Sequence, residues 1–311
     1  MNSDPKVFIV IAHWKNYDIT HACLESLSTI IYSNYHIVVV DDGSPNDSGM
    51  RLKEAFPNVH FILLPKNSGL AHATNCGMQY AMENDADYVL WINNDVLFIK
   101  PDFFTVLMRV FEEMPRVGIV GPKILSPDGS LQNSTNSSFS SLFTDMWGIG
   151  KLRLSISKFS SMNNTRQVAW LVGMALFFKA ELLREIGFLD ERFPFGGEDI
   201  DIAFRAQKKG WDIYYCPLTE IIHIGSASHA DIKSKYHHFY IESPLLFAYK
   251  HYARLVAYVV HISIVLAFCW RGLIFSFFGI IWARYRLKAR IAFEGMSIAM
   301  KFSNKKAMLL S

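Results

Sequence analysis

Apolar runs of strand length alternate with helix-like segments over the first 125 residues, and this alternation limits the possible folds more than any other feature of the chain. The runs cover residues 7–12, 36–40, 59–64, 88–92 and 117–120. Asp18 and Asp47 precede two of the segments between them, where an aspartate oxygen can cap the first turn of a helix. This βαβα order predicts a mainly parallel sheet with helices on both faces.

Polar clusters follow the second, third and fourth of these runs. Their letters are DDGS at 41–44, KNSG at 66–69 and NND at 93–95. Each cluster alone is typical of an ordinary turn. Ligands of parallel α/β sheets bind at the carboxyl ends of the strands, so three clusters at that edge predict a binding site. A carboxylate of Asp41 or Asp42 can accept the N3–H of a uracil or thymine ring, and capping of the next turn is the alternative role.

Phosphate binding requires a device other than the common glycine-rich loops. No GxGxxG follows the first run and no GxxxxGK[ST] occurs, which argues against a dinucleotide oxidoreductase and a P-loop NTPase. Asp95 can instead bind a divalent cation that bridges the phosphates of a diphosphate, and Mg²⁺ or Mn²⁺ suits such an oxygen ligand. His223 follows the apolar pair Ile221-Ile222 and is a second candidate ligand, with a structural histidine as the alternative.

Three carboxylates crowd the expected start of a helix. Glu198, Asp199 and Asp201 follow the pair Gly196-Gly197 directly. Acids in this position interact favourably with the helix dipole, and that role needs no catalytic function. Clustered carboxylates also raise one another's proton affinity, so that one of them can act as a general base toward a sugar hydroxyl.

These motifs, in their order, resemble those of family 2 glycosyltransferases with the GT-A fold, especially rhamnosyltransferase-like enzymes of bacterial polysaccharide synthesis. The resemblance extends from about Val7 to Ser228 and includes VFIVIAHWKN, VVVDDGSPNDS, NSGLAHATNCGMQYA, WINND and the block from WLVGMALFF to GGEDIDIAFRAQKKGW. It implies a Rossmann-like sheet, a nucleotide-sugar donor and a bound Mg²⁺ or Mn²⁺. Two departures are Lys15, where Asn is usual, and residues 240–243, where many relatives have an Arg-Asn pair.

The resemblance also implies roles for individual residues. It makes Asp95 the metal ligand, Asp199 the catalytic base and Glu198 the neighbour of that base. With the candidates found from the residues alone, the predicted donor and nucleotide site comprises Ala12, Trp14, Asp41, Asp42, Asn67, Gly69, Asn75, Asn93, Asn94 and Gly173. The predicted metal ligands are Asp95 and His223.

The implied reaction is a single displacement with inversion at the anomeric carbon. Asp199 takes a proton from an acceptor hydroxyl while a UDP or dTDP leaving group departs, and the metal stabilises the charge that grows on the phosphate. The expected enzyme transfers a hexosyl or deoxyhexosyl group to a glycan or lipid-linked saccharide in cell-surface polysaccharide synthesis. Two alternatives stay open: a nucleotidyltransferase, and a catalytically silent subunit of a membrane assembly that binds a sugar nucleotide or polysaccharide.

The C-terminal region differs in charge and hydropathy from the rest, which predicts a catalytic domain of residues 1–249 and a helical region of residues 250–311. The helical region has ten Lys and Arg against Glu294 alone, a net charge of +9 that leaves −6 for residues 1–249. Residues 255–283 are almost entirely apolar. Basic charge beside an apolar stretch indicates that this region binds an anionic membrane and not nucleic acid. It would attach as a re-entrant hairpin or as a pair of helices in the plane of the membrane. A helical cap or a contact in a homo-oligomer is the alternative.

Two further features bear on location and on the site. Cys23, Cys76, Cys216 and Cys269 form no CxxC pair and predict reduced thiols. With the basic tail, they predict an enzyme on the cytoplasmic face of a bacterial inner membrane. Residues 126–166 are rich in Ser and Asn and predict a loop over the site or an acceptor-binding insertion.

Overall fold

A computed structural model describes residues 4–136, 138–139, 163–193, 196–225, 233–282 and 284–302. Most of the predicted 126–166 insertion lies outside these residues. The chain forms two compact units. The sheet unit contains Met1–Ser138, Met162–Glu191 and Glu198–Ala227, and the helical unit contains Phe139–Ser161, Arg192–Gly197 and Ser228–Ser311. The boundary predicted after residue 249 stays a prediction.

The first half of the sheet unit confirms the predicted alternation. Its elements are β1 (Val7–His13), α1 (Tyr17–Leu27), β2 (Tyr35–Asp41), α2 (Ser48–Ala55), β3 (His60–Leu63), α3 (Leu70–Glu83), β4 (Tyr88–Asn93), β5 (Val96–Phe98), α4 (Phe103–Glu113) and β6 (Val117–Leu125). The second half adds β7 (Thr135–Asn136), β8 (Arg166–Gln167), β9 (Trp170–Leu171), β10 (Ala175–Lys179), α7 (Ala180–Ile186), α8 (Glu198–Lys208) and β11 (Asp212–His223).

The central sheet is mixed, with its parallel part first. Its strand order is β3-β2-β1-β4-β10-β6-β11-β5, and β8 also pairs with β11. The strands β3, β2, β1 and β4 are parallel to one another, and β6 is parallel to β11. The strand β10 is antiparallel to both of its neighbours, and β5 is antiparallel to β11. The predicted α/β architecture is therefore confirmed, with β10 inserted against the common direction.

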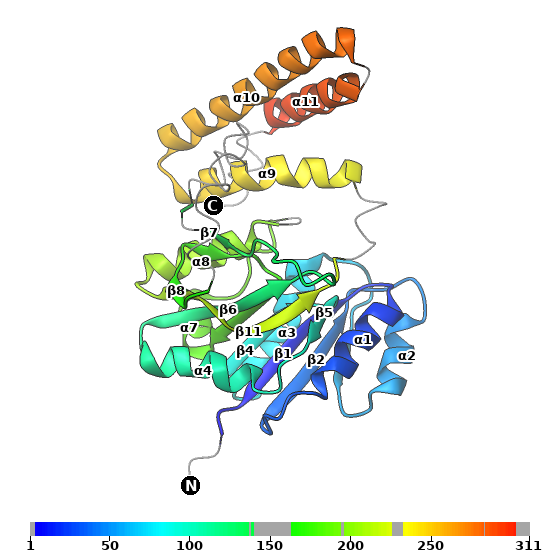
Figure 1. The fold of residues 1–311 in the computed structure, drawn as a ribbon, viewed down its shortest axis with the longest axis vertical. Helices are drawn as coiled ribbons and strands as arrows, with labels where there is room; N and C mark the ends of the chain where they lie inside the picture. The colour runs from blue at the N-terminus through cyan, green and yellow to red at the C-terminus, as the bar shows by residue number, and fades with distance from the viewer. Residues whose placement is uncertain are drawn as a thin grey trace. The chain divides into compact units, whose positions relative to one another are not determined.

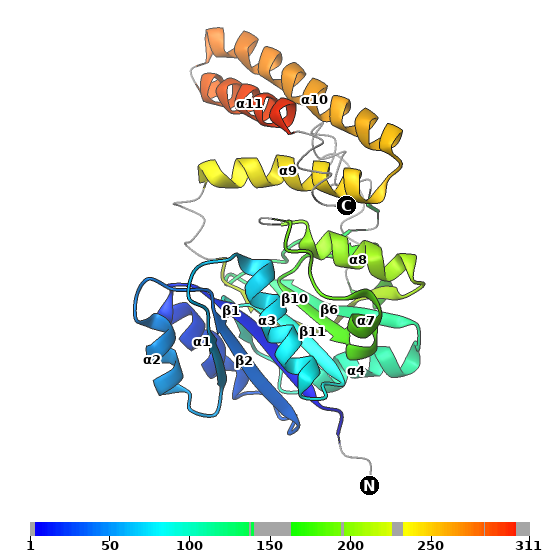
Figure 2. The same ribbon diagram turned by 180° about the vertical axis from the view of Figure 1, so that it is seen from behind.

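Helices cover both faces of the sheet, which explains why its strands are continuous apolar runs. The helices α1 and α4 lie on the face toward the viewer in Figure 1, and α3 lies on the opposite face in Figure 2. Side chains of α1 and α4 join Val7, Ile9 and Ile11 of β1 in one buried core. On the other face α3 packs closely, since a Cβ on Gly77 would lie 2.4 Å from Cγ1 of Val10.

The helical unit contains α9 (Lys233–His251), α10 (Arg254–Ile281) and α11 (Arg284–Lys301). His261 of α10 connects all three helices: its Nδ1 lies 2.8 Å from the Tyr249 hydroxyl of α9, and its Nε2 lies 2.8 Å from the Ala299 carbonyl of α11. The helices α10 and α11 also approach closely at Gly272, where a Cβ would lie 2.7 Å from the Phe293 ring. The predicted C-terminal helices are therefore present.

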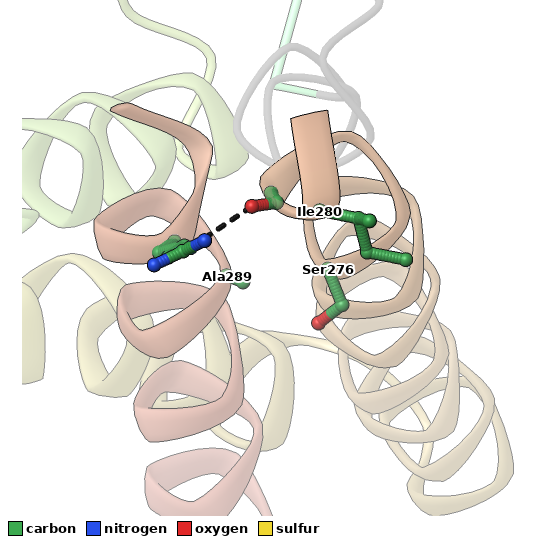
Figure 3. Close-up of a pocket in the computed structure, with 5 residues that line it drawn as sticks. Ser276, Ile280 and Ala289 are labelled. Carbon is green, nitrogen blue, oxygen red and sulfur yellow. Dashed lines mark hydrogen bonds between the residues drawn. The ribbon is translucent and has the colours of Figure 1, made fainter. Parts of the chain in front are cut away.

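Within the described residues, α10 is the helix that is long and apolar enough to cross a membrane: its segment 254–280 has a mean hydropathy of 1.8 and is 22% buried. An open hollow lies between α10 and α11 near the turn that joins them (Figure 3). Ser276, Gly279 and Ile280 line it from α10, and Arg286 donates a hydrogen bond of 3.0 Å from Nε to the Gly279 carbonyl. This hollow contains none of the predicted site residues.

Candidate active site

The register of the parallel strands brings three predicted site residues to one edge. Ala12 of β1 is paired with Asn93 of β4, and the next residue of β1, His13, is paired with Asp41 of β2. Trp14 follows directly, with 37% of its surface exposed and the Lys15 ammonium 3.8 Å from the centre of its ring. The end of β1 therefore lies between the DDGS cluster after β2 and the NND cluster after β4.

Asp41 and Asp42 are buried, and their carboxylates hold loops of this edge. Oδ1 of Asp41 accepts hydrogen bonds from the backbone N–H and the hydroxyl of Ser44, at 3.0 and 2.6 Å. The oxygens of Asp42 accept from the N–H groups of Ser68 and Gly69, at 2.7 and 3.0 Å. Asp42 thus joins the DDGS cluster to the KNSG cluster. Contact of either carboxylate with a base stays a prediction.

Asn67 and Gly69 lie in the loop that Asp42 holds. Asn67 is exposed, and Gly69 has a φ of 101° immediately before α3. Asn75, one turn into α3, has another set of partners. Its amide exchanges hydrogen bonds of 3.0 and 2.9 Å with the backbone of Leu189 and donates to Oε1 of Glu191 at 2.9 Å. Both N–H groups of the Asn75 amide are therefore used within the protein, and its Oδ1 retains one lone pair for a further hydrogen bond.

The Asn-Asn-Asp cluster at the end of β4 connects to two other strands. The Asn94 amide donates to the Thr20 hydroxyl at 2.8 Å, and this hydroxyl lies 2.8 Å from Nδ1 of the buried His13. Asp95 is 5% exposed, and its Oδ1 lies 3.2 Å from Nε2 of His223. His223 reaches this place because β11 pairs with β5, the strand that follows Asp95. The structure therefore brings together both predicted metal ligands.

The chemistry of this pair fits a hard divalent cation. A carboxylate oxygen and an imidazole nitrogen are both common ligands, and two neighbouring ligands of an octahedral ion at about 2.1 Å lie about 3.0 Å from each other. Among the described residues no group of three or more His, Cys, Asp or Glu side chains could hold a metal. Ions such as Mg²⁺ bind through one or two protein ligands and the phosphates of a substrate, so a pair suits a site that needs a bound diphosphate.

Asp199 is positioned from two sides at the start of α8. Its Oδ2 accepts a hydrogen bond of 2.9 Å from the Gly173 N–H, and its Oδ1 accepts one of 2.8 Å from the Ile200 N–H. Gly173 in turn touches β4, because a Cβ on it would lie 2.7 Å from Cη2 of the fully buried Trp91. This contact requires glycine at position 173. The sequence predicts a role for Gly173 but none for Trp91.

A short path of hydrogen bonds connects Asp199 to the strand that precedes Asp95. The N–H of Asn93 donates to the Met174 carbonyl at 3.1 Å, and Met174 is the neighbour of Gly173. Gly173, which donates to Asp199, is therefore next to β4, and β4 ends at Asn93, two residues before Asp95. The other acids of α8 differ, since Asp201 is fully buried and pairs with Arg205 of the same helix at 2.8 Å. Glu198 is 5% exposed beside Asp199.

Comparison with protein families identifies the class of enzyme. Residues 8–183 match the family model for glycosyl transferase family 2, and the chain belongs to this family. It is therefore a glycosyltransferase, as the sequence motifs predict. It is 28% identical over 217 residues to N-acetylglucosaminyl-diphospho-decaprenol L-rhamnosyltransferase of Mycobacterium tuberculosis, a match that covers 64% of this chain and 70% of the relative. It is 24% identical over 229 residues to the low-salt glycan biosynthesis hexosyltransferase Agl10 of Haloferax volcanii, with coverages of 73% and 70%.

Solved structures show the same fold at lower sequence identity. Mannosyltransferase PcManGT from Pyrobaculum calidifontis, in complex with GDP-Man and Mn²⁺, matches 96% of this chain and 87% of its own, with a TM-score of 0.56 and 16% identity. GalNAc-T7 with UDP, GalNAc and Mn²⁺ matches 78% of this chain and 51% of its own, with a TM-score of 0.55 and 16% identity. The GT-A fold predicted from the sequence is confirmed.

Proposed function

We propose that this protein is an inverting, metal-dependent glycosyltransferase with a UDP- or dTDP-sugar donor. Its acceptor is a hydroxyl of a glycan or a lipid-linked saccharide in the synthesis of a cell-surface polysaccharide. The observation that carries the proposal is the placement of the Asp95–His223 pair and of Asp199 at one sheet edge, connected through Asn93, Met174 and Gly173. The relatives support the acceptor class, because one is named for a sugar on decaprenol diphosphate and another for O-antigen biosynthesis.

Each residue of the site has a distinct part in this reaction. Oδ1 of Asp95 and Nε2 of His223 would hold Mg²⁺ or Mn²⁺, which when bound neutralises charge on the departing diphosphate. Asp199 accepts the proton of the acceptor hydroxyl at one carboxylate oxygen, while the N–H groups of Gly173 and Ile200 keep the carboxylate in a fixed direction. Glu198 places a second carboxyl group beside this base.

Donor binding and turnover can be tested separately. Thermal unfolding is first measured with UDP-, dTDP- and GDP-sugars, with and without Mn²⁺, because a ligand at 100 times its Kd stabilises the folded state by about 2.7 kcal/mol. We expect stabilisation by a UDP- or dTDP-sugar that depends on Mn²⁺. Asp95→Ala then removes the effect of Mn²⁺, and Asp199→Asn retains donor binding but lacks turnover. The exposed Asp128→Asn serves as the control for loss of one carboxylate.

Three results would contradict the proposal. Turnover by Asp199→Asn at the rate of the unaltered protein would exclude its role as the base. Release of pyrophosphate from a nucleoside triphosphate would favour the nucleotidyltransferase. Binding of a sugar nucleotide without transfer to any acceptor, and without hydrolysis in Mn²⁺, would favour the silent binding subunit.

We also propose that the helical unit attaches the enzyme to the cytoplasmic face of a bacterial inner membrane. The exposed face of α10 is one apolar stripe at steps of three and four residues, formed by Val259, Ile262, Leu266, Trp270, Leu273 and Phe277. The opposite side of α10 is buried, with Ala257, Ile264 and Ala267 among its inward residues. A helix with one apolar and one packed side suits an in-plane position at the lipid surface, and the basic residues that follow α10 in the chain suit anionic headgroups.

Vesicle binding tests this attachment. We expect the full chain to sediment with vesicles that contain phosphatidylglycerol and to be released when Leu266 and Trp270 are replaced by glutamate. Replacement of the exposed Leu131 of the sheet unit by glutamate is the control. Equal binding by all variants would contradict the role of the stripe, and loss of self-association in place of vesicle binding would favour a homo-oligomer contact.

A further inference from the structure

We propose that Gln132 is a positioning residue of the metal site, which sets the tautomer of His223 so that the Nε2 lone pair faces Asp95. Two hydrogen bonds carry this inference. Nε2 of Gln132 lies 2.9 Å from the His223 carbonyl, and Oε1 of Gln132 lies 2.9 Å from Nδ1 of His223. The proposal deepens the proposed metal-dependent function and rests on it.

The first hydrogen bond fixes the direction of the Gln132 amide. A backbone carbonyl can only accept, so the Gln132 atom that faces it is the NH₂ group, which can only donate. The other end of the amide is then its oxygen, which can only accept. Nδ1 of His223 therefore carries the proton of the second bond. The orientation of one glutamine thus decides which ring nitrogen of the histidine is protonated.

The consequence appears on the other side of the imidazole. In the neutral ring, a proton on Nδ1 leaves Nε2 with its lone pair, and Nε2 lies 3.2 Å from Oδ1 of Asp95. Two acceptor atoms at this distance need a positive charge between them, which is either a second proton on Nε2 or a cation. A divalent cation that replaces this proton finds Nε2 already directed at Asp95, and histidine ligands of metals are commonly oriented by a hydrogen bond from their other nitrogen.

The backbone brings Gln132 to this place by reversing direction after β6. The turn is closed by hydrogen bonds from Ser126 N–H to the Ser130 carbonyl, at 2.7 Å, and from the Gln132 N–H to the Ile124 carbonyl, at 2.9 Å. Because β6 and β11 are neighbours, with Leu125 paired to Ile222, the returning chain passes the end of β11 where His223 lies. Asp128 stabilises the turn by accepting from the N–H and hydroxyl of Ser130, at 2.9 and 2.6 Å.

A purely structural role is the competing explanation, in which Gln132 only attaches the turn to β11. The two roles differ in their effect on ligand binding. If Gln132 only attaches the turn to β11, its loss lowers the stability of the protein and changes the affinity for UDP equally with and without metal. Loss of the tautomer weakens the binding of UDP with Mn²⁺ and leaves the binding of UDP alone unchanged.

The experiment therefore compares Gln132→Leu with Asp128→Ala, which weakens the same turn without touching His223. Calorimetry of the full chain measures the affinity for UDP with and without Mn²⁺, and long-range ¹H–¹⁵N spectra of the imidazole report the tautomer in the metal-free protein. We expect Gln132→Leu to lower the affinity for UDP with Mn²⁺ by about 10- to 100-fold. We also expect it to shift the proton of His223 from Nδ1 toward Nε2. Asp128→Ala should change the affinity for UDP with Mn²⁺ by no more than about twofold. It should also leave the proton of His223 on Nδ1.

Failure of the inference and failure of the proposed function give different results. If Mn²⁺ strengthens UDP binding equally in the unaltered protein and in Gln132→Leu, the positioning role of Gln132 is wrong and the metal site stands. If Mn²⁺ has no effect on UDP binding in the unaltered protein, the metal-dependent function is wrong, and the inference is wrong with it. An equal loss in Asp128→Ala and Gln132→Leu would establish the structural role instead.

Discussion

Replacement of Gly173 by alanine tests whether the contact of Gly173 with Trp91 of β4 positions Asp199, the proposed catalytic base. The added Cβ would lie 2.7 Å from Cη2 and 3.2 Å from Cζ3 of Trp91, and 3.3 Å from Cβ of Asp199. Carbon atoms normally approach to about 3.5 Å, so a relative movement of about 0.8 Å is needed at the ring. Trp91 is fully buried in the central sheet, and the movement therefore falls mainly on the segment of Gly173 and on Asp199.

Such a displacement should affect catalysis more than donor binding. Overpacking of this kind costs about 1–3 kcal/mol of folding free energy. A displacement of about 1 Å in a catalytic group can lower the rate about 100-fold. We expect Gly173→Ala to lower kcat by about 10- to 100-fold, with a Kd for UDP, which lacks the donor sugar, within about twofold of the unaltered value. Single-turnover transfer to an acceptor measures the first quantity, and calorimetry with UDP measures the second.

Gly118→Ala provides a matched control at the amino end of β6. Its Cβ would meet Cδ2 of Leu182 at 2.9 Å and Cε3 of Trp211 at 3.1 Å, so it is nearly as crowded. Its position lies away from the carboxyl edge where the site residues gather. We expect a similar loss of stability in urea and an unchanged kcat. If both variants lose stability equally and both retain kcat, Gly173 has no role in positioning Asp199.

Three further predictions concern residues near Asp41, at the proposed nucleotide end of the site. Gly49→Ala would place a Cβ 2.0 Å from Oδ2 of Asp41 and so displace this carboxylate. We expect the Kd for UDP, measured by calorimetry, to rise about tenfold. An unchanged Kd would show that Asp41 makes no contact with the base. Lys15 has a φ of 66°, which asparagine tolerates better than lysine. Lys15→Asn should therefore raise the free energy of unfolding, measured in urea, by about 0.5–1 kcal/mol. A decrease would mean that the contact of the Lys15 ammonium with the Trp14 ring stabilises the protein by more than the backbone strain costs. Burial lowers the pKa of His13, although Asp41 opposes this shift. Below the unfolded pKa the unfolded state binds the additional proton, so stability should fall as the pH drops from about 7 to 5; His13→Gln should reduce this slope, and an unchanged slope would assign it to other groups.

Local sequence determined the strands, the helices between them and the polar residues at the strand ends. Strands that are covered on both faces must be apolar throughout, so β1, β2 and β4 could be recognised without knowledge of their neighbours. Because parallel strands end at the same edge, Asp41 and Asn93 could also be expected to lie near each other. The acid cluster at the start of α8 could be recognised from three carboxylates within four residues that follow two glycines. Its position relative to Asp95 could not be predicted.

Tertiary structure alone decided how the side chains are used, because contacts between distant segments leave no periodic pattern in the sequence. Pairing of β11 with β5 places His223 beside Asp95, and the return of the chain after β6 brings Gln132 to the same imidazole. The contact of Gly173 with Trp91 depends on β10, whose antiparallel direction no local signal predicted. The one-sided exposure of α10 likewise depends on its packing against α11, since its sequence is apolar around most of its circumference.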